Sequence, residues 1–368
     1  MMDYNIEDRL KRLKSRRMDA SNVSLLTRGY VEEFDRRTNN QATRYALGSM
    51  QEVDFRSTEI SIEEAQKVEK ALTERLPKHG YRPEFRLQGS VPMNTHIRGA
   101  SDVDLLEILG ETLTFARSGP NAPNYSLSTR PGTIADEVLA MRKVSEEELS
   151  THFWGATIDK TNAKSIQLSD GAFRRKVDVV PSHWFDSVDY QQHRHEVFRG
   201  IGIIDKHTKE NHHNYPFLFR HHIDQKGAET DGGAKMAIRL LKNLSADSQK
   251  ELAISSYDIA SLVFHCPPHT IAREVARDLA IISGISAFLN QLAANRSEAE
   301  TLMSPDRTRR IFDKSEKWNS LLTLAENTSQ LAREVERELV GPSIFMDRDF
   351  GQVLKSLNES RIPVVPTY

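Results

Sequence analysis

Two aspartates on alternate positions of an apolar segment are the feature that most restricts how this chain can fold. The segment is Asp102-Val103-Asp104-Leu105-Leu106, and it follows Gln88-Gly89-Ser90 after eleven residues. Alternate residues of a strand point to one face, so both carboxylates share a face and Val103 and Leu105 take the other. Neighbouring carboxylates repel each other unless a cation lies between them, and Mg²⁺ prefers oxygen ligands of this kind. We therefore expect a strand that carries a metal site.

A second short, β-branched segment carries a third aspartate. In Lys176-Val177-Asp178-Val179-Val180-Pro181 the acid lies between apolar neighbours, where a charge is unfavourable unless it is paired or binds a metal. Pro181 is expected to end this strand, because proline has no N–H for an interior ladder. If the two strands are neighbours, Asp102, Asp104 and Asp178 converge and can hold two Mg²⁺ ions, or Mn²⁺ in their place, for an in-line displacement. These three acids are the predicted catalytic and metal-binding residues of a nucleotidyltransferase.

The tripeptide Gln88-Gly89-Ser90 is predicted to bind the nucleotide that such a site uses. Gly89 has no side chain to keep a phosphate from the backbone, and the Ser90 hydroxyl and nearby N–H groups can donate to triphosphate oxygens. Val91-Pro92-Met93 is expected to begin a short helix whose N-terminus faces the anion. An Asp-x-Asp or a Gly-Ser pair alone is commonly a solvated turn. The combination of turn, spacing, apolar flanks and third acid favours catalysis.

Composition and charge limit the class of protein. The chain has 368 residues, which is enough for two lobes. It has no apolar run long enough to cross a membrane and no apolar secretion segment near its start, so we expect neither. The single Cys266 excludes an internal disulfide framework and fits a reducing cytoplasm. A formal net charge of −2 disfavours binding to long DNA, which normally needs a basic surplus.

The predicted elements divide the chain into two parts. Residues 1–50 are predicted to be mostly helical, residues 81–205 to form a mixed α/β sheet unit, and the chain beyond about residue 226 to be helical. The predicted fold class is α+β, with a catalytic lobe over residues 1–225, N-terminal helices included, and a helical lobe over residues 226–368. The active site is expected in a cleft between the lobes.

Local signals set the bounds of several predicted elements. Ser61-Ile62-Glu63-Glu64 has capping-box spacing and predicts a helix from there to about Leu76. A second capped helix is expected over Thr133–Arg142. Strands are predicted at Phe85–Leu87, Val103–Leu109, Ser165–Leu168 and Lys176–Val180.

The helical lobe contains two further motifs. Arg239 and Lys242 are three residues apart and share a helix face. An ordinary amphipathic helix would place them on a solvated face, but beside a triphosphate site they would supply the positive charge that the β and γ phosphates need. In Ser255-Ser256-Tyr257 the serines can cap a helix, and Tyr257 can either belong to the core or stack on a nucleobase.

These motifs lie between residues 80 and 265 and together resemble a known family. The Gly-Ser turn with the three aspartates resembles the DNA polymerase β-like nucleotidyltransferase superfamily. Leu240-Leu241-Lys242, Ser255-Ser256-Tyr257 and Val263-Phe264-His265 narrow the resemblance to the cGAS/DncV-like nucleotidyltransferases (CD-NTases) of bacterial CBASS antiphage systems. The chain lacks the Cys-rich zinc element and the basic DNA-binding balance of the animal enzyme, so activation by DNA is not expected.

The resemblance implies an activity and roles for residues. NTPs, ATP among them, would be joined into a cyclic di- or trinucleotide second messenger with release of pyrophosphate, in antiphage defence. Asp102 and Asp104 would bind both metals, and Asp178 would bind the one that activates the attacking hydroxyl. The resemblance also implies a regulatory partner protein and a downstream effector that binds the product. By the same resemblance, Ser90, Lys242 and Ser256 would contact the donor triphosphate. Tyr257 would stack on a base.

Two alternatives remain open at this point. One is a nucleotidyltransferase that modifies a macromolecule or a small molecule, and it needs the same three acids. The other is a non-catalytic nucleotide-binding module, which the presence of all three acids disfavours. In the His-rich segment 193–222, polar hairpin and loop positions near Lys206–Pro216 are favoured over a metal cluster, because the spacing of the histidines is irregular and cysteine partners are missing. The last residues, Arg361–Tyr368, are expected to be extended.

Overall fold

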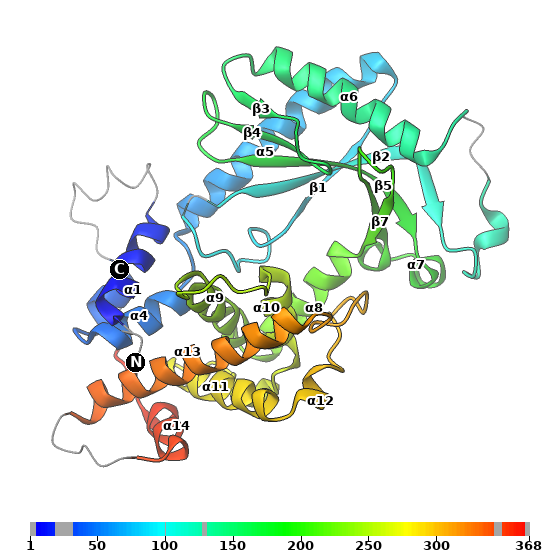
Figure 1. Ribbon diagram of the computed structural model, residues 1–368. Helices are drawn as coiled ribbons and strands as arrows, with labels where there is room; N and C mark the ends of the chain where they lie inside the picture. Colours follow the sequence, from blue (N-terminus) through cyan, green and yellow to red (C-terminus); the bar gives the residue numbers. More distant parts are fainter. Residues whose placement is uncertain (1–4, 19–31, 100, 127–130, 342–347, 365–368) are drawn as a thin grey trace. The chain divides into compact units, whose positions relative to one another are not determined.

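The computed structural model describes residues 5–18, 32–99, 101–126, 131–341 and 348–364 (Figure 1). It forms two compact units, one sheet-based and one helical, as the predicted α+β class requires. The helical unit combines residues 1–53, 94–99 and 222–368, and the sheet unit combines residues 54–93 and 100–221. The chain therefore passes between the units at 53/54, 93/94, 99/100 and 221/222.

The sheet unit is built on a seven-stranded mixed sheet. Its main path has the order β1-β2-β5-β4-β3, and β6 pairs with β5 and with β7. β2 and β5 are parallel, and the other pairings among the described strands are antiparallel. The strands are β1 (Glu84–Gln88), β2 (Val103–Phe115), β3 (Thr157–Asp159), β4 (Ile166–Ser169), β5 (Val177–Asp186), β6 (Gly200–Ile204) and β7 (Asn211–Asn214).

Two helices, α5 (Phe55–Arg75) and α6 (Ile134–His152), cover one face of this sheet (Figure 1). Their buried residues pack against alternate residues of the two parallel strands, Val103 and Leu105 on β2 and Val177 on β5. The residues between these positions must point to the opposite face of the sheet. A short helix, α7 (Val188–His193), follows β5.

Both parallel strands run further than predicted. β2 continues to Phe115, and β5 continues through Pro181 to Asp186, so the expectation that Pro181 ends the strand is wrong. On one side β5 pairs with β4 up to Val179 and with β6 from Ser182 onward. Pro181 lies in the gap between these two pairings, where a residue without an N–H is tolerated.

The helix ends show where local signals were decisive. Thr133 caps α6 through a complete capping box with Asp136, as predicted, although the helix runs past Arg142 to His152. The predicted start of α5 at Ser61 is wrong. Asp54 caps the helix upstream by accepting from the Ser57 N–H, and the Ser61 hydroxyl instead bonds backbone carbonyls inside the fold.

The helical unit contains the remaining α-helices of the described residues, although α8 begins in the sheet unit. They are α1 (Ile6–Arg17), α3 (Glu33–Arg37), α4 (Gln41–Met50), α8 (Pro216–Glu229), α9 (Gly233–Ala246), α10 (Ser256–His265), α11 (Leu279–Ala294), α12 (Arg296–Ala299), α13 (Ser315–Val340) and α14 (Phe350–Glu359). The last passage between the units lies within α8. No helix in the described ranges is both long and apolar enough to span a membrane.

The helices at the start of the chain belong to this unit, which differs from the predicted boundary at residues 225/226. Asp247, which is 2% exposed and follows α9, accepts from Arg16 of α1 at 2.8 Å and from the Tyr45 hydroxyl of α4 at 2.8 Å. Such a buried carboxylate needs these donors. The first helices thus pack beside α9, far away in the sequence.

The hairpin expected near residues 206–216 of the His-rich segment is present, whereas the two ends of that segment lie in α7 and α8. β6 and β7 pair from Ile201↔Asn214 to Ile204↔Asn211, and β7 carries His212 and His213. His213 stacks on Phe185, with ring centroids 4.1 Å apart.

Candidate functional site

One row of residues crosses four strands of the sheet. Gln88 on β1 is in register with Asp104 on β2, Asp104 with Asp178 on β5, and Asp178 with Gln167 on β4. These positions alternate with the residues that pack on α5 and α6, so the row lies on the opposite face. The structure therefore places the third aspartate directly beside Asp104.

The three carboxylates interact electrostatically. Burial raises the pKa of Asp104 to about 7, and the charges of Asp178 and Asp102 add to this increase. The pKa of Asp178 is also raised, mainly by burial and further by Asp102. Asp102 itself is exposed and lies just before β2 rather than on it. The site thus carries negative charge that a nearby cation would stabilise.

The donor set fits a divalent cation at the Asp104–Asp178 pair. Mg²⁺ needs only one or two protein carboxylates, since water and substrate phosphates complete its shell. Within the described part of the chain, no three His, Cys, Asp or Glu residues are grouped closely enough to hold a metal ion. Metal binding by Asp102, Asp104 and Asp178 therefore stays a prediction.

Asp178 also receives hydrogen bonds that were not predicted. The Gln167 amide nitrogen lies 3.3 Å from its Oδ1 and 3.4 Å from its Oδ2, and the Ser165 hydroxyl lies 3.4 Å from Oδ1. The sequence does carry a signal, because Ser165 and Gln167 alternate with Ile166 and Leu168. That alternation predicts the β4 strand, but it does not predict that β4 pairs with β5, which carries Asp178.

Gly89 allows Asp104 to take its position. The residue has a φ of +83°, and a Cβ atom placed on it would lie 2.3 Å from Asp104 Oδ2. A side chain at this position would thus both strain the backbone and displace the carboxylate. Gly89 and Ser90 directly follow Gln88, so the turn begins at the row of polar residues.

The predicted helix at Val91-Pro92-Met93 is absent. Residues 90–94 form turns, and Asn94 has a φ of +54°, a left-handed conformation that a right-handed helix cannot continue through. Any anion bound at Ser90 would therefore meet turn backbone rather than a helix N-terminus.

Arg239 and Lys242 of α9 are buried, at 2% and 8% exposure, so a solvated helix face is excluded. Arg239 donates to the carbonyls of Met50 at 2.7 Å and Asn94 at 2.6 Å, and Lys242 donates to that of Thr95 at 2.7 Å. Burial is the main cause that lowers the pKa of Arg239 to about 10 and that of Lys242 to about 8. Contact of either cation with a triphosphate stays a prediction.

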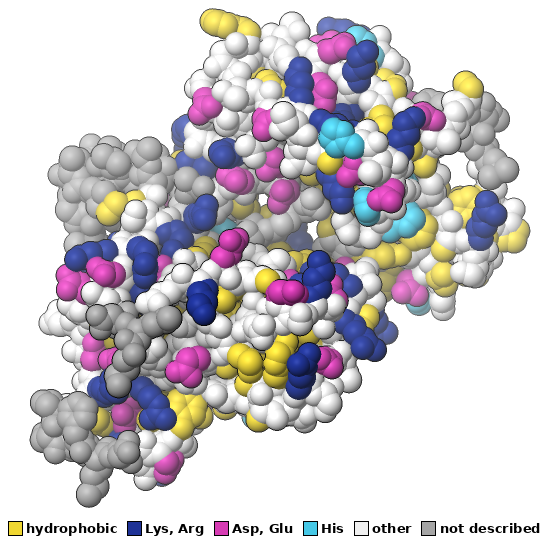
Figure 2. Space-filling model, viewed as in Figure 1, with side chains coloured by type: hydrophobic (Ala, Val, Ile, Leu, Met, Phe, Trp, Pro, Cys, Tyr) yellow, Lys and Arg dark blue, Asp and Glu magenta, His cyan; other side chains and the backbone are white. Residues whose placement is uncertain are grey.

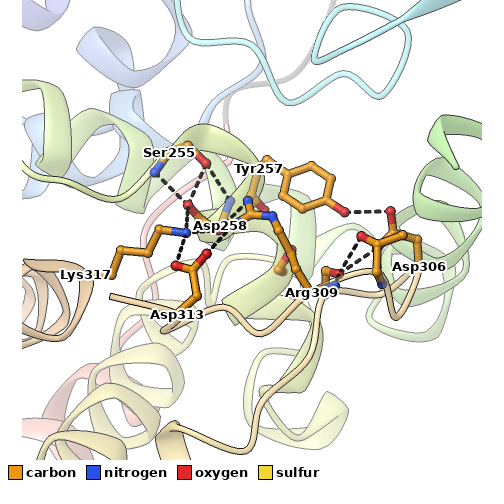
Figure 3. A network of polar contacts seen from close by, with 10 residues as sticks. Ser255, Tyr257, Asp258, Asp306, Arg309, Asp313 and Lys317 are labelled. Atoms are coloured by element: carbon orange, nitrogen blue, oxygen red, sulfur yellow. Dashed lines mark hydrogen bonds and ion pairs between the residues drawn. The ribbon is translucent and has the colours of Figure 1, made fainter. Parts of the chain in front are cut away.

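The Ser-Tyr motif opens α10 (Figure 3). Ser255 is the N-cap and forms a capping box with Asp258, while Ser256 is exposed in the first turn. The half-buried Tyr257 donates its hydroxyl to Asp306 at 2.7 Å, and the Arg309 guanidinium lies over its ring, 4.9 Å from the centroid. Base stacking by Tyr257 stays a prediction. Asp306 holds its hydroxyl and Arg309 covers one face of its ring, so a base would have to stack on the other face.

Asp258 connects this motif to two later segments (Figure 3). Besides capping α10, Asp258 forms ion pairs with Arg309, at 2.7 Å, and with Lys317 of α13, at 3.2 Å. Lys317 also pairs with Asp313 at 2.9 Å. Because the Asp258 carboxylate is buried, these cations compensate its charge and fix the start of α10.

Comparisons with known proteins agree on one family. Residues 221–331 match the family model described as the cGAS/DncV-like nucleotidyltransferase C-terminal helical domain. The chain is 40% identical over 325 residues to the cyclic dinucleotide synthase CdnE of Yersinia aleksiciae, a match that covers 87% of this chain and 84% of the relative. It is 30% identical over 287 residues to a c-di-GMP synthase of Lachnospiraceae bacterium (strain RUG226), covering 73% and 81%.

A solved structure shares the fold over nearly the whole chain. The STING-associated CdnE c-di-GMP synthase from Capnocytophaga granulosa aligns with a TM-score of 0.73 and 26% identity, covering 89% of this chain and 97% of that one.

Proposed function

Because the chain belongs to the cGAS/DncV-like nucleotidyltransferases, we propose that it joins two nucleoside triphosphates into a cyclic dinucleotide and releases pyrophosphate. The similarity to the Yersinia aleksiciae enzyme, over most of both chains, supports this activity. The observation that carries it in the structure is the register of β2 and β5, which sets Asp104 beside Asp178 on one face of the sheet.

The chemistry requires two successive transfers. A ribose hydroxyl of one nucleotide attacks the α-phosphorus of another, the bond from the α-phosphorus to the bridging oxygen breaks, and pyrophosphate leaves. Two Mg²⁺ ions, or Mn²⁺ in their place, would supply the charge that stabilises the attacking and leaving oxygens. Asp178, which is in register with Asp104, would orient the attacking hydroxyl and assist removal of its proton. The linear product then turns, and its own triphosphate becomes the donor that closes the ring.

The other predicted residues are assigned to substrate binding. Gln88, Gly89 and Ser90 would contact the triphosphate from the turn beside Asp104. Lys242, Arg239 and Ser256 would also contact it, and Tyr257 would stack on a base. Two relatives named c-di-GMP synthases support GTP as the first substrate to test, with ATP next. A regulatory protein and an effector for the product, in antiphage defence, complete the proposal.

The direct test is a product assay. Purified protein is incubated with labelled NTPs and Mg²⁺ or Mn²⁺, followed by phosphatase, and each NTP is omitted in turn. We expect a phosphatase-resistant product whose bases the omissions identify. Asp104→Asn and Asp178→Asn should lower the rate by on the order of 10³-fold, since each removes a charge that holds the metal. Asp170→Asn is the matched control, because Asp170 is exposed just beyond β4.

Two results would contradict the proposal. Product formed at the normal rate by Asp104→Asn would show that the row is not the active site. Pyrophosphate released only when a macromolecule or another small molecule is added, with no cyclic product, would identify a different acceptor.

A further inference from the structure

We propose that Gln167 is a positioning residue, which holds the Asp178 carboxylate in the orientation that metal binding requires. The proposal rests on the proposed function, because it deepens the role of the same site. It starts from the strand register: Gln167 on β4 faces Asp178 on β5 in an antiparallel pair. Directly opposite residues of such a pair have side chains close enough to interact.

The contact involves both carboxylate oxygens. The Gln167 Nε2 atom lies 3.3 Å from Oδ1 and 3.4 Å from Oδ2 of Asp178. Ser165 adds a third contact, at 3.4 Å from its hydroxyl to Oδ1. Each oxygen has two lone pairs, so the two donors to Oδ1 occupy both of its acceptor sites, whereas Oδ2, with one donor, keeps a site for a cation. Donors on both oxygens restrict rotation of the carboxylate about its Cβ–Cγ bond.

Asp104 is held in a different way. Its Oδ2 lies in the space that a side chain on residue 89 would fill. The two acids of the pair therefore differ: Asp178 has donors from β4, whereas Asp104 Oδ2 occupies the space left by the missing side chain of Gly89.

The chemistry of an amide suits this role. Asp178 lies beside the like charge of Asp104 and needs a donor to keep its carboxylate from turning away. A lysine or arginine on β4 would provide that donor, but its charge would compete with the metal. A neutral amide donates without reducing the negative charge available to the cation.

The test compares Gln167→Met with the wild type and with Ser169→Ala. Methionine keeps the length of the side chain and removes the donor. Ser169 is the matched control, because it lies on the same face of the same strand and donates to Asp170 instead. The first readout is Mn²⁺ binding to the nucleotide-free protein, followed by paramagnetic resonance. The second is the Mg²⁺ dependence of cyclic dinucleotide formation.

We expect Gln167→Met to weaken Mn²⁺ binding by about tenfold, the lower range for partners of metal ligands. Its product formation should need correspondingly more Mg²⁺, with KM for the NTPs little changed, while Ser169→Ala behaves as the wild type. Mn²⁺ affinity and Mg²⁺ dependence unchanged in Gln167→Met would overturn the inference. So would a variant that only melts at a lower temperature and loses activity equally at every Mg²⁺ concentration.

The wild type and Asp178→Asn separate this outcome from failure of the proposed function. If wild-type protein binds Mn²⁺ and Asp178→Asn does not, the metal site stands whatever Gln167→Met does. If the two bind Mn²⁺ equally, the metal site itself is wrong and the inference falls with it.

Discussion

Glu107 is a buried acid on the same strand as Asp104, but it points to the face covered by α6. The Ser145 hydroxyl donates to its Oε1 at 2.6 Å, whereas its Oε2 has no hydrogen-bond partner among the described residues. Burial raises the pKa of Glu107 to about 7 from an ordinary 4.5, although Ser145 and the charge of Arg142 act in the opposite direction. The folded protein therefore retains this proton at pH values where the unfolded chain has lost it.

That difference predicts how stability depends on pH. Between about pH 4.5 and 7 the folded state binds more protons at Glu107 than the unfolded state does. The free energy of unfolding therefore falls as pH rises through this range, and the contribution of Glu107 is constant above pH 7. Glu107→Gln removes the ionisation. We expect it to raise the free energy of unfolding at pH 8 by on the order of 3 kcal/mol, with the gain shrinking toward pH 4.5.

Urea unfolding at pH 5 and pH 8 measures this effect. Glu74→Gln, on the exposed face of α5, is the control and should change little at either pH. A Glu107→Gln variant less stable than the wild type at pH 8 would contradict the prediction.

At the scale of single elements, two cations of α9 bind backbone carbonyls close to two of the four points where the chain passes between the units. Arg239 joins the carbonyls of Met50 and Asn94, and Lys242 binds that of Thr95. Met50 lies just before the passage at 53/54, and Asn94 directly follows the one at 93/94. The segment after the Gly-Ser turn is thus anchored by buried cations of a helix that is distant in the sequence.

This anchoring is testable by amide hydrogen exchange without nucleotide. Hydrogen bonds from charged donors contribute about 1.5–3 kcal/mol, so Arg239→Met and Lys242→Met should speed exchange over residues 94–99 by about tenfold or more. Lys235→Met on the same helix is the control, because Lys235 pairs with Asp224 instead. Unchanged exchange in both variants, together with weaker NTP binding, would mean that the two cations act on the triphosphate alone.

At the scale of the whole molecule, charge is balanced rather than concentrated. The formal net charge is −2, with 50 Lys and Arg against 52 Asp and Glu. On the face that Figure 2 shows, cationic and anionic side chains are interspersed. Binding to long DNA depends on clustered cations that release counterions from phosphates, and a balanced net charge does not favour it.

We therefore predict that long double-stranded DNA neither binds nor activates this protein. At about 0.15 M salt, adding DNA should leave the rate of cyclic dinucleotide formation within twofold, because the electrostatic contribution to non-specific binding is small. A gel-shift titration checks binding, and the product assay checks activation. A retarded complex together with faster synthesis would show that a basic surface outside the face in Figure 2 overrides the net charge.

The fold class, and the residues proposed for the candidate site, could be predicted largely from local sequence pattern. The alternation over Val103–Leu106 and the β-branched run around Asp178 each define a strand face, and the Thr133 cap fixes where α6 begins. Such signals can be recognised in the sequence because they depend on residues within a few positions of one another. Two predictions from local signals were wrong. Asp54 rather than Ser61 caps the start of α5, and the left-handed conformation of Asn94 prevents the helix expected at Val91.

Only the tertiary structure decided which distant residues meet. It paired β2 with β5, so that Asp104 lies beside Asp178, and it brought Gln167 to the same carboxylate. It also placed α1 and α4 with α9 and set Arg309 over Tyr257. The sequence by itself determined the acids and their faces, because side-chain direction repeats with a fixed local period. Their partners depend on packing between segments dozens to hundreds of residues apart, and no local period encodes that.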